Sequence, residues 1–246
     1  MAERAARAAG ALLLERFGGP ASGVEQKSSS TDMVSDADRD AEALVVELLR
    51  SERPDDGLLG EEDASREGSS GRRWVVDPLD GTTNYLYGFP AWAVSVAVED
   101  ADGGLAGVVL DPVRGDLFAA ERGRGLRLNG EPAGVREPVA VEQALVATGF
   151  SYERRRRAEQ AEVLTGVLPR VRDVRRAGAA ALDLAMVAGG RLDGYYERGL
   201  RPWDWAAGRL AVAEAGGTVV DLEGEPLGLV AASTPELAAE LVGLVG

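Results

Sequence analysis

The chain has 246 residues, of which 45% are apolar and 28% are charged, so it can form a sizeable core, and global disorder is excluded. Its 27 basic and 41 acidic residues give a net charge of −14, which disfavours nucleic acid, because such binding depends on neutralising phosphates with Lys and Arg. No apolar run approaches a membrane span, and the start of the chain lacks the apolar centre of a secretory signal. We therefore expect no membrane partner and a cytoplasmic protein.

The chain contains no histidine and no cysteine. This excludes Ser-His-Asp and Cys-His nucleophile systems, and it also excludes phosphohistidine and cysteine phosphatase chemistry. It disfavours a zinc centre, since zinc sites nearly always use these residues. An enzyme of this composition must use carboxylates, Lys, Tyr, hydroxyl groups or metals held by oxygen. Oxygen ligands favour Mg²⁺, Mn²⁺ or Ca²⁺.

The first part of the chain predicts two helices and then an antiparallel sheet. A helix is expected over residues 2–17, followed by a polar loop over 26–32 and a second helix that begins at Ser35 and Asp38. Short apolar segments then predict strands at 74–76, 92–98, 108–110, 117–119 and 126–128.

From residue 144 onwards, predicted strands and helices alternate. Strands are expected at 144–147, 173–176, 194–196, 219–220 and 229–231, and helices at 154–168, at 179–188, from Pro202 to Gly216, and from Pro235 onwards. This alternation predicts an α/β architecture. We divide the chain into two closely packed parts, residues 1–140 and 141–246.

The stretch from Asp77 to Thr82 is the strongest candidate for a reaction centre. Asp77 ends a predicted buried strand, and Pro78 is expected to stop the strand ladder there. Asp80 follows in a turn, so both carboxylates are expected at one rim. If a helical turn begins at Gly81, its free N–H groups face the same rim and form an anion site. The alternative is an ordinary Asp-Gly turn with Asp77 as a cap; we favour phosphate chemistry.

Three further acidic segments are candidates for the same site. Residues 61–63 are consecutive acids, which repel one another unless they are solvated or bound to cations. Asp204 stands between two tryptophans just inside a predicted helix, where an unpaired buried acid is costly, so a cap or ligand role is expected. Glu197 ends a predicted strand, and either hydrogen-bonds substrate hydroxyls or pairs with an Arg.

In order and spacing, these segments resemble the inositol monophosphatase family of the lithium-sensitive, magnesium-dependent sugar-phosphatase superfamily. The matching residues are 27–29, 32–38, 60–62, 74–84, 181–184, 193–197, 202–204 and 214–217, which cover nearly the whole chain. The resemblance implies a five-layer α-β-α-β-α sandwich of the inositol monophosphatase/fructose-1,6-bisphosphatase type, usually dimeric. It also implies hydrolysis of inositol 1-phosphate by a metal-activated water, with two to three Mg²⁺ ions.

The resemblance also implies roles for individual residues. A first metal is assigned to Glu61, Asp77 and the Leu79 carbonyl, a second to Asp77, Asp80 and Asp204, and a weaker third to the vicinity of Glu61. The substrate contacts are assigned to Asp80, Gly81, Thr82, Gly178, Ala179, Ala180 and Glu197. Thr82, with Glu61 or with Asp38, orients the attacking water.

Two departures from the family pattern affect substrate choice. Tyr87-Gly88 stands where many relatives carry a basic residue or histidine, and Ala179 stands where they often have Ser or Thr. Histidinol-phosphate phosphatase, fructose-1,6-bisphosphatase and 3′-phosphoadenosine 5′-phosphate phosphatase activities remain alternatives within the same fold. A regulatory binding protein that retains the fold is the non-enzymatic alternative.

Overall fold

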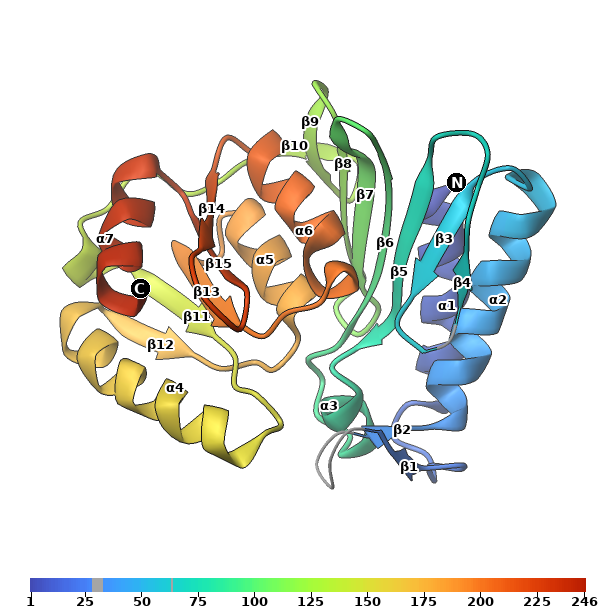
Figure 1. Cartoon of the computed structure of the whole chain (residues 1–246), viewed down its shortest axis with the longest axis horizontal. Helices are drawn as coiled ribbons and strands as arrows, with labels where there is room; N and C mark the ends of the chain where they lie inside the picture. Colours follow the sequence, from blue (N-terminus) through green and yellow to red (C-terminus); the bar gives the residue numbers. More distant parts are fainter. Residues whose placement is uncertain (28–32, 63) are drawn as a thin grey trace.

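Five layers of alternating helices and sheets build the protein (Figure 1). The computed structural model describes residues 1–27, 33–62 and 64–246. The outer helix layers are α1 (Ala2–Arg16) with α2 (Asp36–Glu52) on one side, and α4 (Arg154–Val167) with α7 (Pro235–Val245) on the other; α5 (Ala180–Ala188) and α6 (Pro202–Glu214) form the central layer. The predicted five-layer sandwich is therefore confirmed.

The first sheet lies between α1/α2 and α5/α6. Its strand order is β10-β9-β8-β7-β6-β5-β3-β4. The strands are β3 (Gly57–Gly60), β4 (Ser65–Arg66), β5 (Arg73–Asp80), β6 (Ala93–Asp100), β7 (Gly103–Asp111), β8 (Asp116–Glu121), β9 (Gly125–Leu128) and β10 (Glu131–Ala133). The sheet is antiparallel except where β3 runs parallel to β5. Along β5, Trp74 and Val76 pack towards α1 and α2, and Val75 packs towards α5 and α6, because successive side chains point to opposite faces.

The strand β5 is longer than predicted. Pro78 does not end it, because β5 continues to Asp80, and its register against β6 shifts between Asp77 and Asp80. Such a bulge tolerates proline, since the residue there need not donate to the ladder. The irregularity brings three residues, Asp77, Leu79 and Asp80, to the end of one strand.

The second sheet lies between the central helices and α4/α7. Its order is β12-β11-β13-β15-β14, formed by β11 (Leu145–Thr148), β12 (Asp173–Arg175), β13 (Gly194–Arg198), β14 (Thr218–Leu222) and β15 (Gly228–Ala232). The strands β12, β11 and β13 are parallel, β15 pairs antiparallel with β13, and β14 pairs antiparallel with β15. One apolar cluster includes Val75 and Phe118 of the first sheet and Tyr195 and Ala231 of the second. The central helices thus share a core with both sheets.

Most predicted elements are present with ends shifted by a few residues. The sequence reasoning missed two strands within or beside the polar loop, β1 (Glu25–Gln26) and β2 (Met33–Val34), which pair with each other. The short helix α3 (Thr82–Leu86) begins one residue after Gly81. The division at residue 140 falls between β10 and β11 and stays a prediction. In the part of the chain that the structure describes, no helix is long and apolar enough to cross a membrane.

Candidate active site

Parallel pairing of β3 and β5 brings Glu61 beside Asp77. In this register Gly60 pairs with Val76, so the residues that follow them, Glu61 and Asp77, lie at the same edge of the sheet. The backbone N–H of Glu61 donates to the carbonyl of Val76 at 3.1 Å, which fixes this position. The Asp77 side chain is 1% exposed, and its Oδ1 accepts a hydrogen bond from the Leu79 amide at 3.0 Å.

Asp80 ties the end of β5 to the central helix layer. Its carboxylate accepts hydrogen bonds from three backbone amides of the first turn of α5, those of Ala180 (3.1 Å), Ala181 (2.8 Å) and Leu182 (3.3 Å). These amides have no partner within the helix, and the helix dipole favours an anion at this end. Asp80 therefore caps a helix that lies a hundred residues away in the sequence, a role that the sequence did not predict.

Asp204 approaches Asp77 through the strand β6. Ser95 is the cross-strand partner of Asp77, and its hydroxyl donates to the carbonyl of Trp203 at 3.3 Å, next to Asp204. Asp204 lies in the first turn of α6, and its Oδ2 accepts a hydrogen bond from the Arg201 amide at 2.6 Å. The predicted cap role of Asp204 is confirmed.

Burial and mutual repulsion raise the pKa values of the three aspartates in this group. Burial first, and then the charges of Glu61, Asp80 and Asp204, raise the pKa of Asp77 well above 3.8. Burial also raises the pKa of Asp80 to about 7, against the lowering effect of the α5 amides. The pKa of Asp204 is raised by burial and by the neighbouring acids. The fold thus holds several carboxylates close together in a setting that disfavours their charged forms.

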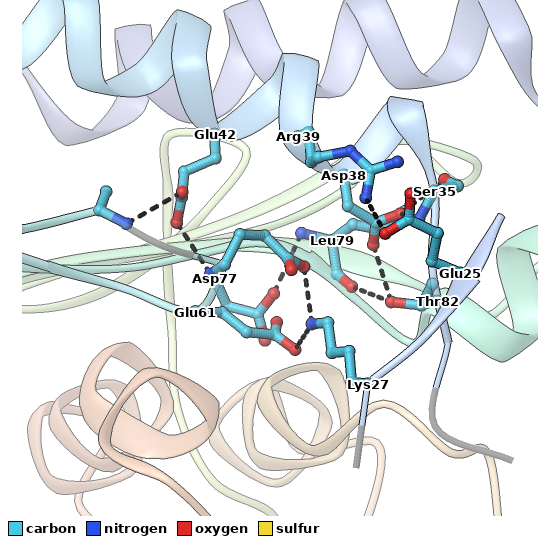
Figure 2. Close-up of polar contacts among 12 residues, drawn as sticks. Glu25, Lys27, Ser35, Asp38, Arg39, Glu42, Glu61, Asp77, Leu79 and Thr82 are labelled. Carbon is cyan, nitrogen blue, oxygen red and sulfur yellow. Dashed lines mark hydrogen bonds and ion pairs between the residues drawn. The ribbon is translucent and has the colours of Figure 1, made fainter. Parts of the chain in front are cut away.

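Thr82 and Asp38 are brought together as predicted for the water-orienting pair. The Thr82 hydroxyl donates to Asp38 Oδ1 at 2.9 Å and also lies 3.2 Å from the Leu79 carbonyl oxygen. The other Asp38 oxygen accepts from the Ser35 amide at 2.9 Å and from its hydroxyl at 2.6 Å, which confirms the predicted helix start (Figure 2). The fully buried Asp38 carboxylate thus has a fixed orientation towards Thr82.

The second sheet contributes Glu197 to the same region. The strands β11 and β13 are parallel, so Gly149 and Glu197, which follow paired residues, lie side by side. A Cβ added at Gly149 would collide with the Glu197 carboxylate. The Tyr195 hydroxyl donates to Glu197 Oε2 at 2.6 Å. Burial raises the pKa of Glu197 to about 6, although Tyr195 and Arg176 oppose this rise. Among the described residues, no arginine forms an ion pair with Glu197, so the alternative of a direct Glu197–Arg pair is not observed there.

The turn before α5 lies against the end of β5. Gly178 has a φ of +91°, a conformation that favours glycine, and the Arg176 guanidinium occupies the place of its missing Cβ. A Cβ added at Gly81, which has a φ of +94°, would lie 3.2 Å from Cβ of Ala179. Gly81 and the Gly178–Ala180 turn are therefore in close contact, although nothing in this geometry tests their assignment as substrate contacts.

The residues present fit a divalent metal by the chemistry of the donor set. The site holds oxygen ligands only, several of them buried carboxylates whose repulsion a divalent cation would relieve. Within residues 1–27, 33–62 and 64–246, however, no three acid side chains converge as a ready-made metal cage. Each of these carboxylates has another partner, namely the α5 amides at Asp80, the Arg201 amide at Asp204 and Lys27 at Glu61.

Sequence reasoning assigned no individual role to Lys27 or Glu42, and it considered Glu62 only as part of the acidic run 61–63. The Lys27 ammonium lies 2.9 Å from Glu61 Oε1 and 2.8 Å from Glu62 Oε1 (Figure 2). Burial lowers the pKa of Lys27, but the two carboxylates outweigh this effect and raise it above 10.5. The Glu42 carboxylate holds this loop, since it accepts from the amides of Glu62 (3.0 Å) and Ala64 (3.2 Å). Two signals for Lys27 were available, since it is the only lysine in the chain and it belongs to the segment 27–29 that matches the family pattern. Asp63, part of the predicted acidic run, and residues 28, 29 and 32 lie outside the described residues.

Comparison with known proteins agrees with this geometry. The model of the inositol monophosphatase family matches residues 1–245. The chain is 43% identical to the inositol-1-monophosphatase SuhB of Mycobacterium tuberculosis, over 93% of this chain and 83% of that protein, and 42% identical to the Nus factor SuhB of Escherichia coli, over 91% and 85%. The crystal structure of the extragenic suppressor protein suhB from Bartonella henselae superposes with a TM-score of 0.92 at 38% identity, covering 99% of this chain and 96% of the other. The IMPase of Thermotoga maritima superposes with a TM-score of 0.89 at 31% identity, covering 98% and 94%. The chain belongs to the inositol monophosphatase family.

Proposed function

We propose that this protein is a Mg²⁺-dependent phosphomonoesterase that hydrolyses inositol 1-phosphate to inositol and phosphate. The observation that carries the proposal is that Asp77, Asp80 and Asp204 are buried near one another and near Glu61 at the end of β5, where burial and mutual repulsion raise the pKa values of the three aspartates. Relatives named inositol-1-monophosphatase, which align over most of the chain, support the choice of substrate.

In this proposal the acids divide between two principal metal positions. Glu61, Asp77 and the Leu79 carbonyl hold one Mg²⁺, and Asp77, Asp80 and Asp204 hold a second, with a weaker third ion near Glu61. Bound Mg²⁺ would lower the pKa of a water molecule and neutralise charge on the phosphoryl oxygens. The capping bonds support this division, because an Asp80 carboxylate oriented by three amides still has lone pairs available for a ligand.

Thr82, Asp38 and Glu61 orient the attacking water in the proposed reaction. The Thr82 hydroxyl gives its hydrogen to Asp38 Oδ1, so its lone pairs remain free to accept a hydrogen bond from water. The Glu61 carboxylate accepts the other hydrogen of the water and serves as the proton acceptor. The buried hydrogen bonds from the Ser35 amide and hydroxyl fix the Asp38 carboxylate, so its other oxygen stays directed at Thr82.

The substrate lies between the two sheets in this proposal. The amides of Gly81 and Thr82 bind the phosphate, and the Gly178–Ala180 turn and Glu197 face the alcohol, with Asp80 between them. Close contact of Gly81 with Ala179 supports a shared pocket. Ala179 offers no hydroxyl, so we expect the alcohol to be recognised chiefly by the Glu197 carboxylate, which the Tyr195 hydroxyl orients.

A second candidate is a binding role beside catalysis, favoured because the Escherichia coli relative at 42% identity is named a Nus factor.

We further propose that the protein is a homodimer, works in the cytoplasm and is inhibited by lithium. Sedimentation analysis of the purified protein tests the dimer directly, and a monomer at micromolar concentration contradicts it.

The decisive experiment is a phosphate-release panel across inositol, histidinol, fructose and adenosine phosphates, with Mg²⁺ titrated. We expect release from inositol 1-phosphate that depends on Mg²⁺ and is abolished by EDTA. Preference for histidinol phosphate or fructose 1,6-bisphosphate would change the proposed substrate but keep the protein a phosphatase of the same fold. Absence of Mg²⁺-dependent release from every phosphate refutes the enzymatic proposal and leaves the binding role.

A further inference from the structure

The one lysine of the chain lies in the acidic site. The 27 basic residues are Lys27 and 26 arginines. The Lys27 ammonium is within 2.9 Å of both Glu61 and Glu62, and its side chain is 24% exposed. In the part of the chain that the structure describes, no other basic side chain forms an ion pair with Glu61, Asp77, Asp80 or Asp204.

The type of cation matters at this position. An arginine holds carboxylates through a planar fork with parallel bonds, whereas a lysine ammonium is a compact, strongly hydrated point charge on a flexible stem. Lysine is therefore the side chain that can neutralise two carboxylates and still leave for solvent. Its partial exposure provides a path for that departure.

The backbone that carries Lys27 is anchored independently of the acids. Lys27 follows β1, and the Arg39 guanidinium holds this segment through the Gly23 carbonyl at 2.6 Å and through Glu25 at 3.6 Å. Release of the ammonium therefore requires rotation of one side chain, without loss of the β1–β2 pairing. Glu62 stays in place as well, since Glu42 holds its amide.

We propose that Lys27 is a tethered counter-cation that occupies the Glu61 side of the site in the metal-free protein and is displaced when a divalent cation binds. An ammonium and a divalent cation that contact the same Glu61 carboxylate repel each other at short range and must share its negative charge, so binding of one weakens binding of the other. Lys27 thereby offsets the repulsion among the acids before loading, and it sets the apparent metal affinity by competition. The inference rests on the metal-binding role proposed for Glu61.

Because Lys27 is the only lysine, its chemical accessibility can be followed without mutation. The purified protein is acylated briefly with an amine-reactive ester, with and without saturating Mg²⁺, and digested with trypsin for mass spectrometry; the N-terminal amine serves as an internal control. We expect Mg²⁺ to raise the acylation rate of Lys27 and to leave that of the N-terminus unchanged. A rate that is unchanged or lowered by Mg²⁺ overturns the proposal.

Direct Mg²⁺ titration by calorimetry tests the competition. Lys27→Gln removes the ammonium, and we expect it to bind Mg²⁺ at least about fivefold more tightly, the lower end of typical coupling between two ligands. Lys27→Arg is expected to bind no more tightly than the wild type. Arg16→Gln is the matched control, since it removes one positive charge that pairs with Asp40 and with none of the four acids, and it should change the affinity much less.

The outcomes separate this inference from the proposed function. Failure of the wild type and all variants to bind Mg²⁺ refutes the metal-dependent function itself. Normal Mg²⁺ binding by the wild type, with equal or weaker binding by Lys27→Gln, refutes only the displacement of Lys27. A tightening in Arg16→Gln equal to that in Lys27→Gln also refutes it, because the effect then comes from net charge and not from the ion pair.

Discussion

Substitution of Asp80 separates its structural role from its proposed chemical role. The carboxylate accepts three amides of α5, at 2.8, 3.1 and 3.3 Å, and is also a proposed metal ligand. Asp80→Asn removes the charge and one acceptor, so the Ala180 amide loses its partner, but it keeps an oxygen that can accept from Ala181 and Leu182. Asp80→Ala removes the charge and both acceptor oxygens. Since each variant removes the same charge from the acidic group, the difference between their stabilities reports the two bonds from Ala181 and Leu182.

The hydrogen bonds of Asp80 set the expected loss of stability in these variants. Loss of a helix cap costs about 0.5–2 kcal/mol, and each buried donor left without a partner costs about 1–3 kcal/mol. The two bonds that Asp80→Asn can keep measure 2.8 and 3.3 Å, so we expect the free energy of unfolding of Asp80→Ala to be about 2–4 kcal/mol below that of Asp80→Asn. Loss of the charge should lower turnover about 10²–10³-fold in both variants, the usual effect of removing one electrostatic contact in an active site.

Urea unfolding followed by circular dichroism, with EDTA present, measures the stability of the metal-free proteins. Phosphate release from inositol 1-phosphate at saturating Mg²⁺ measures turnover. Equal stability of the two variants refutes the capping role of Asp80. Turnover of Asp80→Asn close to that of the wild type refutes its role in the chemistry, whatever the stability result.

Three further predictions concern the alcohol pocket, an ion pair and the metal site. Gly149→Ala should raise KM for inositol 1-phosphate without changing Mg²⁺ affinity, because the added methyl displaces Glu197; Gly166→Ala, whose Cβ meets nothing within 4 Å, should change neither. Arg209 lowers the pKa of Asp221 below 3.8 in the folded protein through hydrogen bonds of 2.6 and 2.9 Å. The ion pair therefore stabilises the fold fully above the pKa of the unfolded chain, and this stabilisation is lost as the pH falls through the lower pKa of the folded state. The stability advantage of the wild type over Asp221→Asn in urea unfolding should therefore vanish in strong acid, and a constant difference contradicts this. Added LiCl should inhibit turnover progressively relative to NaCl at the same ionic strength; equal curves for the two salts count against lithium sensitivity.

The local sequence contained enough information for most elements. Ser35 and Asp38 formed the predicted helix start because a capping box satisfies its own backbone donors within four residues. Strands such as β6 were predictable because both faces are covered, which requires a nearly continuous apolar run. Zero histidine and cysteine limited the chemistry to oxygen ligands before any geometry was known.

Other features had no local signal. The two-residue strands β1 and β2 lie in or beside a polar stretch, and β5 passes through Pro78 by a bulge that depends on its partner β6. In the sequence, Asp77 cannot be distinguished from an aspartate in a solvated turn. Only its burial beside Glu61 and Asp204 makes its charged form unfavourable.

The sequence by itself determined the family, the layered fold and the identity of the acids around Asp77, because these depend on residue types in a fixed order. The tertiary structure alone decided which partner each acid has. Asp80 reaches the amides of α5, and Lys27 reaches Glu61 and Glu62, because the parallel strand ends and the central helices bring together segments that lie between 34 and 102 residues apart. Contacts over such separations depend on the packing of whole layers, which no pattern within a single segment encodes.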